Sequence, residues 1–338
     1  MKRFVAALLI TAPVFAQEAP LFTTSTNSVL VDAAVTGDQR VIEGLGREDF
    51  VVLENGQPIT IAGMAHDELP LDIVLVCRSV LVGPAAPPDP NGDNLPHYHM
   101  GAQAASVSQR LMNAAANAVL GSRPGDRVAV VTYGRDPHIE LRFTSDRKAI
   151  ANAIKRAGSA DDADDNLVLT SEALAIEYAV RMIADVERDD PNARTNRRRV
   201  IIMISNVDGV GTRYADEPII RRLWEQNIIL SVIEDLPPTQ AIKSVQRSSG
   251  GESQTILFRR YNPIRIAQAT GGDRIVAMDP QHPGDLLTPI RQRYTLWFNQ
   301  PSDVTPGESR TIKVDLSEAA RRRFPGAVIQ AREGYVTR

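Results

Sequence analysis

The sequence has only one cysteine, few aromatic residues, no excess of basic charge and no long hydrophobic run. A single cysteine cannot form an internal disulfide, so the stability of the fold must come from packing. The net charge of −3 offers no concentrated basic surface, which argues against a nucleic-acid partner. The runs Arg197–Arg199 and Arg321–Arg323 are each only three residues long, and we expect both to be solvated edges.

The first 16 residues have the layout of a secretory signal peptide. Lys2 and Arg3 precede an apolar run from Phe4 to Ile10, and small residues follow before Gln17. The apolar run is shorter than the ~20 residues needed to cross a bilayer, so no membrane span is expected. We expect cleavage after Ala16 and export to the periplasm, the cell envelope or the exterior. An ordinary buried first strand or helix is the alternative.

Residues 26–65 and 293–338 both show the alternation of apolar and polar residues that is typical of strands. Asn55 and Gly56 in "ENGQ" predict a tight hairpin turn in the first segment. In the second segment, "YTLWFNQ", "RTIKVDL" and "VIQAREGYV" are predicted strands, separated by the turn-rich "PSDVTPGES" and "SEAARRRFPGA". Each segment alone has too few strands to bury a face, so we expect the two to pair into one small β domain.

Residues 69–291 follow a different pattern, in which continuous apolar runs such as "LDIVLVC" and "RRRVIIMIS" alternate with amphipathic helices. Apolar strands that alternate with helices are typical of a mainly parallel sheet covered on both faces. The predicted fold class is therefore α/β, with a doubly wound, Rossmann-like sheet and the small β domain beside it. Ligands of such sheets bind beyond the carboxyl ends of the strands, and "CRSVL", "NLVLT" and "SNVDG" should meet there.

The order of these elements resembles the von Willebrand factor A superfamily. The flanking stretches "VDAAVTGDQRVIEGLGREDFVVLENGQPI", "ATGGDRIVAM" and "QAREGYVTR" are most similar to the acidobacterial type of related protein. The resemblance implies a metal-ion-dependent adhesion site, built from Asp-x-Ser-x-Ser, a Thr and a later Asp. Matched residue by residue, these positions fall on Cys77, Ser79, Leu81, Val168 with Thr170 two residues on, and Asn206.

Only Ser79 clearly keeps the family's residue, so the resemblance implies a degenerate site. Mg²⁺ prefers carboxylate, hydroxyl and water oxygens, and a thiol with an amide does not replace two aspartates. Ser79, Asp165 and Asp208 could converge as substitute ligands, although a solvated loop and a turn are the simpler interpretation. His97 and His99 could begin a transition-metal site, but no third ligand is identifiable.

No G-x-S-x-G, H-E-x-x-H or phosphate-binding motif is present in the sequence, and no histidine is tied to Cys77 by a motif. We therefore expect a non-enzymatic protein that recognises a protein or another extracellular macromolecule, with no cofactor. Asp72 should lie at the opposite end of its strand from Cys77, too far away to replace the missing aspartate. A metal-dependent adhesion module using Mg²⁺ or Mn²⁺, or a structural envelope protein, is the alternative.

Overall fold

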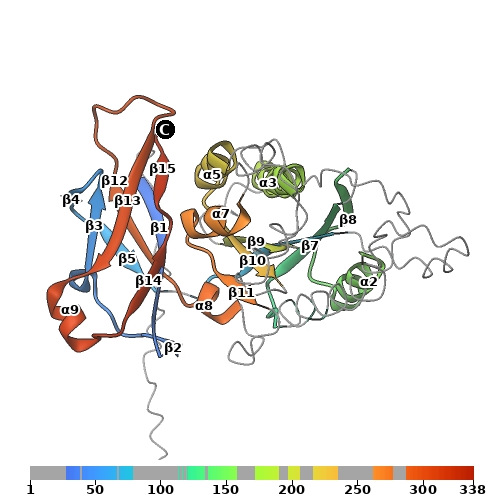
Figure 1. Cartoon of the computed structure of the whole chain (residues 1–338), viewed down its shortest axis with the longest axis horizontal. Helices are drawn as coiled ribbons and strands as arrows, with labels where there is room; N and C mark the ends of the chain where they lie inside the picture. Colours follow the sequence, from blue (N-terminus) through green and yellow to red (C-terminus); the bar gives the residue numbers. More distant parts are fainter. Residues whose placement is uncertain are drawn as a thin grey trace, which may run out of the picture.

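The computed structural model describes residues 28–38, 40–66, 68–78, 113, 116, 119, 121–133, 136–157, 172–189, 197–205, 216–234, 262–276 and 287–338. Two domains lie side by side, an α/β domain and a smaller β domain (Figure 1). The α/β domain is continuous in sequence, whereas the β domain is built from both ends of the described chain.

A six-stranded sheet in the order β11-β10-β9-β6-β7-β8 forms the centre of the α/β domain. Every neighbouring pair is parallel except β7 with β8, which is antiparallel. This confirms the predicted α/β class with a mainly parallel sheet. The strands are β6 (Leu71–Arg78), β7 (Arg127–Tyr133), β8 (His138–Thr144), β9 (Arg198–Ile204), β10 (Ile228–Glu234) and β11 (Arg274–Val276).

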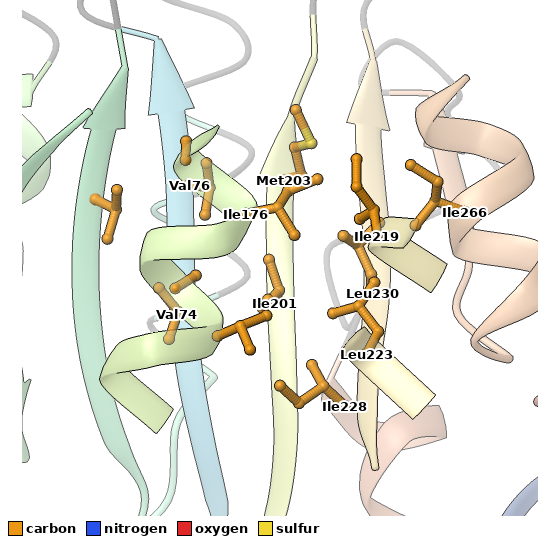
Figure 2. Packing of buried hydrophobic residues seen from close by; sticks show 14 of the residues in the cluster. Val74, Val76, Ile176, Ile201, Met203, Ile219, Leu223, Ile228, Leu230 and Ile266 are labelled. Carbon is orange, nitrogen blue, oxygen red and sulfur yellow. The ribbon is translucent and has the colours of Figure 1, made fainter. Parts of the chain in front are cut away.

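Helices cover both faces of this sheet, as expected for strands that are apolar on both sides. One face packs against α2 (Arg147–Ala157) and α8 (Leu287–Arg291). The other face packs against α3 (Glu172–Asp189), α5 (Asp216–Glu225) and α7 (Pro263–Ala269). Figure 2 shows this second layer, in which Ile176 of α3 and Ile219 of α5 lie over Ile201 and Leu230 of the sheet.

The β domain consists of two antiparallel sheets around a shared apolar core. One has the order β14-β1-β12-β5 with β2 on the edge of β1, and the other has the order β15-β13-β3-β4. Strands from the two ends of the chain therefore alternate, because β1 pairs with both β12 and β14. The strands are β1 (Ser28–Gly37), β2 (Arg40–Val41), β3 (Phe50–Glu54), β4 (Gln57–Ile59), β5 (Gly63–Ala65), β12 (Tyr294–Asn299), β13 (Ser309–Leu316), β14 (Val328–Ala331) and β15 (Gly334–Val336).

Two expectations for the β domain need correction. The stretch expected to be a turn-rich loop contains a helix, α9 (Glu318–Arg323), whose first turn is capped by the Ser317 side chain. The stretch "VIQAREGYV" is not one strand but two, β14 and β15, which belong to different sheets. The predicted hairpin turn between β3 and β4 is confirmed, with positive φ at Asn55 and Gly56.

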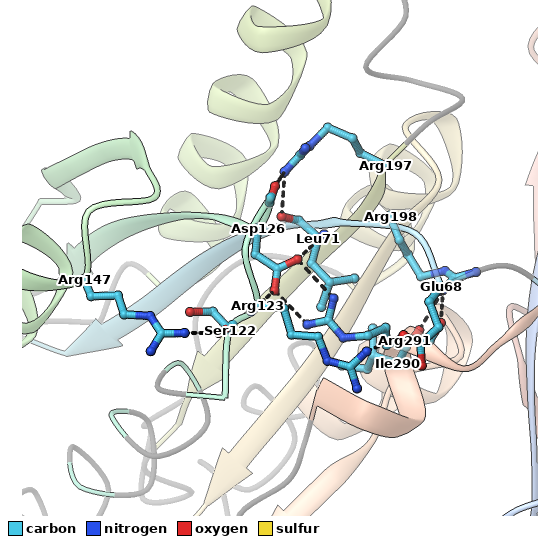
Figure 3. Close-up of polar contacts among 11 residues, drawn as sticks. Glu68, Leu71, Ser122, Arg123, Asp126, Arg147, Arg197, Arg198, Ile290 and Arg291 are labelled. Carbon is cyan, nitrogen blue, oxygen red and sulfur yellow. Dashed lines mark hydrogen bonds and ion pairs between the residues drawn. The ribbon is translucent and has the colours of Figure 1, made fainter. Parts of the chain in front are cut away.

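The junction between the domains lies at the amino ends of the parallel strands. Figure 3 shows Asp126 there, where it accepts hydrogen bonds from the Leu71 amide (2.8 Å) and from both terminal nitrogens of Arg291 (3.1 and 2.7 Å). Leu71 begins the α/β domain and Arg291 ends α8, the last helix before β12. One buried carboxylate therefore holds both segments by which the chain passes between the domains.

The prediction that Arg197–Arg199 form a solvated edge is wrong. Arg198 and Arg199 are 2% and 3% exposed, and Arg197 pairs with Asp72 at 2.7 Å. Arg198 begins the central strand β9 at the domain junction, where its guanidinium donates to carbonyl oxygens of residues 290 and 291. Arg198 also donates to Asp32 and Thr295 of the β domain, so covering by the second domain, which no local pattern reveals, explains its burial. Arg321–Arg323 on α9 do remain exposed.

Candidate functional site

The expected binding edge lies beyond the carboxyl ends of β6, β7, β9 and β10. Of the residues predicted to occupy it, Cys77 lies in β6 and is described by the structure. The prediction for Asp72 is confirmed, because Asp72 lies at the other end of β6 and pairs with Arg127 and Arg197. The other candidates lie outside the described residues: Ser79, Leu81, His97, His99, Asp165, Val168, Thr170, Asn206 and Asp208.

Cys77 is completely buried within the core cluster on the α2 side of the sheet. Its thiol lies 3.9 Å from the carbonyl oxygen of Val131, to which it can donate a weak hydrogen bond. Burial, with a smaller contribution from the charge of Glu140, raises the pKa of the Cys77 thiol to about 12. The side chain is therefore a neutral thiol at any physiological pH.

A neutral, buried thiol does not fit a hard divalent cation at this position. Mg²⁺ takes oxygen ligands and favours carboxylates, whereas a cysteine ligand must be deprotonated. Within the part of the chain that the structure describes, no three histidine, cysteine, aspartate or glutamate residues come together as a metal site. The described residues thus offer no replacement for the aspartate that Cys77 displaces.

A buried polar cluster that the sequence analysis did not single out lies at the same edge, on the opposite face of the sheet from Cys77. The Tyr133 hydroxyl lies 2.9 Å from Glu172 Oε1 and 2.8 Å from the carbonyl oxygen of Ile204. Ser205 Oγ lies 3.3 Å from the same carboxylate oxygen. The cluster joins the ends of β7 and β9 to the start of α3. The one local signal was an acidic residue at the start of a helix, which is common and not specific.

A second buried carboxylate at this edge is Glu234, the last residue of β10. It forms an ion pair with Arg274 on the neighbouring strand β11. Burial raises its pKa although Arg274 opposes the shift. Glu172 and Glu234 are both bound by other protein groups, so these carboxylates hold the scaffold of the edge together.

Comparison with known families identifies the domain. The model of the family described as "von Willebrand factor type A domain" matches residues 100–210. The match supports the von Willebrand factor A superfamily for the α/β domain, in which these residues lie. The predicted resemblance is confirmed at the level of the superfamily. The matched segment begins after β6, so Cys77 and the first strand of the sheet lie outside it.

Several solved structures are similar to this chain at low identity. An aerotolerance-related membrane protein from Bacteroides fragilis is 15% identical, with coverage of 62% of this chain and 92% of that one and a TM-score of 0.37. Proximal thread matrix protein 1 from the mussel byssus is 12% identical, with coverage of 70% and 50% and a TM-score of 0.38. The vWF domain of the type V pili tip protein Mfa5 from Porphyromonas gingivalis is 17% identical, with coverage of 42% and 39% and a TM-score of 0.24.

At these identities and TM-scores the likenesses carry no information on function, and this chain spans half of the mussel protein. No curated protein sequence matches the chain significantly. Among the described helices, none is both long and apolar enough to cross a membrane.

Proposed function

We propose that this protein binds another protein, or another extracellular macromolecule, through the carboxyl edge of its von Willebrand factor type A domain. Domains of this superfamily are generally interaction modules without enzymatic activity, which supports binding as the class of function. The ends of four parallel strands meet at this edge, which is where open α/β sheets bind their partners.

The burial of Cys77 is the observation that favours binding without a metal bridge. A cation between the domain and its partner would need the carboxylate that this position lacks, and the protonated thiol contributes no charge. The same burial argues against a catalytic cysteine, because the thiolate is the nucleophile and a thiol of such high pKa stays protonated.

Calorimetry of the mature chain, residues 17–338, tests the metal-free part of the proposal. Titration with MgCl₂ or MnCl₂ should give no saturable heat, and Asp208→Ala should behave like the unchanged protein. Stoichiometric uptake that Asp208→Ala abolishes would instead establish the alternative, a metal-dependent module with substitute ligands at Ser79, Asp165 and Asp208.

Site-specific photo-crosslinking tests the binding edge itself. Asp136 is exposed and lies just beyond the carboxyl end of β7, whereas Arg322 is exposed on α9 in the other domain. A photoreactive residue at position 136 should give covalent adducts with a partner at the surface of the producing cell, and chelation by EDTA should not reduce them. Equal adducts from position 322, or loss of the adducts in EDTA, would contradict the proposal.

We also propose that the chain is exported, on the basis of its first 16 residues. The protein recovered from the producing cell should begin at Gln17, as read by N-terminal sequencing. Recovery of an intact N-terminus from the cytoplasm would exclude export by this route.

A further inference from the structure

Arg293 is the most unusual buried residue of the domain junction. It lies between α8 and β12, on the second segment that connects the two domains, and its exposed fraction is 0%. Its Nε, Nη1 and Nη2 atoms make no hydrogen bond to any residue that the structure describes. A guanidinium has five N–H donors, and donors buried without acceptors are rare in folded proteins.

The charges around Arg293 do not balance among the buried groups. Arg198 is also buried, and it lies close enough for its positive charge to act on Arg293. The one buried carboxylate whose charge acts on Arg293, Asp32, already accepts hydrogen bonds from Arg198 (3.1 Å) and from the Thr295 hydroxyl (2.7 Å). Asp273 also acts on Arg293 by its charge, but its side chain is partly exposed.

Loss of a proton does not resolve this imbalance. Burial, and then the charge of Arg198, lower the pKa of Arg293, but an arginine in a protein stays protonated at neutral pH. A buried charge is stable only where another charge or a set of hydrogen bonds compensates it. A water molecule could accept the N–H groups, but it adds no negative charge to the buried Asp32 and the partly exposed Asp273 that act on Arg293.

We propose that Arg293 and Arg198 hold a small monovalent anion, such as chloride, at the junction of the two domains. An anion accepts several N–H donors at once and supplies the missing negative charge. The Nε of Arg198 likewise has no hydrogen-bond partner among the described residues, and Nη2 of the same side chain lies 3.4 Å from the backbone carbonyl oxygen of Arg293, which makes Arg198 the candidate second donor. The anion would stabilise the contact between the domains, and this inference is independent of the proposed binding function.

Thermal unfolding of the mature chain in mixtures of sodium chloride and sodium gluconate, at constant ionic strength, tests the site. We expect a saturable rise in Tm of roughly 2 to 5 °C as chloride replaces gluconate. Arg293→Met should lose this dependence on chloride. Arg310→Met is the matched control, because Arg310 pairs with Glu54 and Glu308 inside the β domain and should keep the dependence.

Anomalous diffraction from crystals of the unchanged protein grown in sodium bromide gives a second measurement, which does not depend on a variant that folds. A bromide peak in contact with the Arg293 guanidinium would support the proposal. A water molecule at that position without anomalous signal would overturn it. So would equal Tm values in chloride and gluconate, or a rise in Tm that Arg293→Met leaves unchanged.

Discussion

The thiol of Cys77 lies at the end of β6 in the packed interior, at the position where the superfamily resemblance implies an aspartate. A carboxylate there would face apolar neighbours, since Cys77 lies in the same core cluster as Leu75, Ile150 and Ile154. An aspartate at this position would need a bound cation, because a charged group buried without a counter-charge is strongly destabilising. A domain that lost the metal would therefore also lose the aspartate.

Cys77 should be chemically silent in the folded protein. Because the thiol is fully buried and its pKa is raised to about 12, dithionitrobenzoate should not label the native chain at pH 8. After unfolding in guanidinium chloride, one thiol per chain should react. The absorbance of the thionitrobenzoate released by the reagent measures the labelling of the native and of the unfolded chain. The Cys77→Ser variant provides the blank. Rapid labelling of the native protein would contradict the burial of this residue.

The elements of the fold were more predictable than their connections. Apolar runs and helical spacing sufficed for β6, β9 and the helices, because buried strands and amphipathic helices leave local signatures. Helix α9 also had such a signature, a serine cap followed by alanine and arginine, but the neighbouring Pro and Gly favoured a loop. No local signature marked the division of "VIQAREGYV" into two strands, because contacts with the α/β domain cause it.

At that break, Arg332 pairs with Thr270 in an isolated bridge and the Glu333 amide donates to the carbonyl oxygen of Ala269. Tertiary contacts of this kind decide the outcome and cannot be seen in a local pattern. The candidate site shows the same limit. The sequence analysis found no histidine tied to Cys77 by a motif, but no motif could reveal the contact of Tyr133 with Glu172, which joins residues 39 positions apart.

Asp126 holds together two secondary-structure elements, β6 at the start and α8 at the end of the α/β domain. Burial disfavours its charged form, but hydrogen bonds from Arg291 and from the amides of Arg123 and Leu71, together with the Arg291 charge, hold its pKa below the usual range. Asp126→Asn should lower the free energy of unfolding by about 3 to 5 kcal/mol, because Arg291 would remain buried without a counter-charge. Urea unfolding measures the loss.

The sign of the pH effect follows from the lowered pKa. The contribution of Asp126 is fully present above the pKa of an unfolded aspartate, about 3.9, and is lost as the pH falls through the lower folded value. Below about pH 4 the unchanged protein should therefore lose stability more steeply than Asp126→Asn. Asp315→Asn, which breaks a surface pair with Arg321, should cost less than about 1 kcal/mol. Equal costs for the two variants would refute the role of Asp126.

At the scale of the whole molecule, α5 and the end of α7 contact the segment between β14 and β15 of the β domain. Within the α/β domain, the Trp224 side chain of α5 donates to the carbonyl oxygen of Ala269 at the end of α7 at 2.8 Å. The Arg332 guanidinium reaches both domains, with hydrogen bonds to the carbonyl oxygens of Trp224 (3.2 Å) and Leu30 (2.5 Å). The "TGG" and "AREGY" stretches thus meet across the junction, so their spacing reflects docking of the domains.

Gly271 gives the test of whether the two domains unfold as one unit. Its φ is +76°, and a Cβ atom there would lie 2.7 Å from the carbonyl carbon of Ala331, so an alanine would push the domains apart. Scanning calorimetry of the unchanged protein should show one transition, with equal calorimetric and van't Hoff enthalpies. Gly271→Ala should lower Tm and separate the transition into two.

Gly56→Ala is the matched control, because Gly56 also has a positive φ, +81°, but no atom lies within 4 Å of the added Cβ. It carries the same backbone strain in a hairpin turn without a clash at the junction. It should therefore lower Tm while the transition stays single. Two transitions in the unchanged protein, or the same profile for both variants, would show that contacts between the domains do not couple their unfolding.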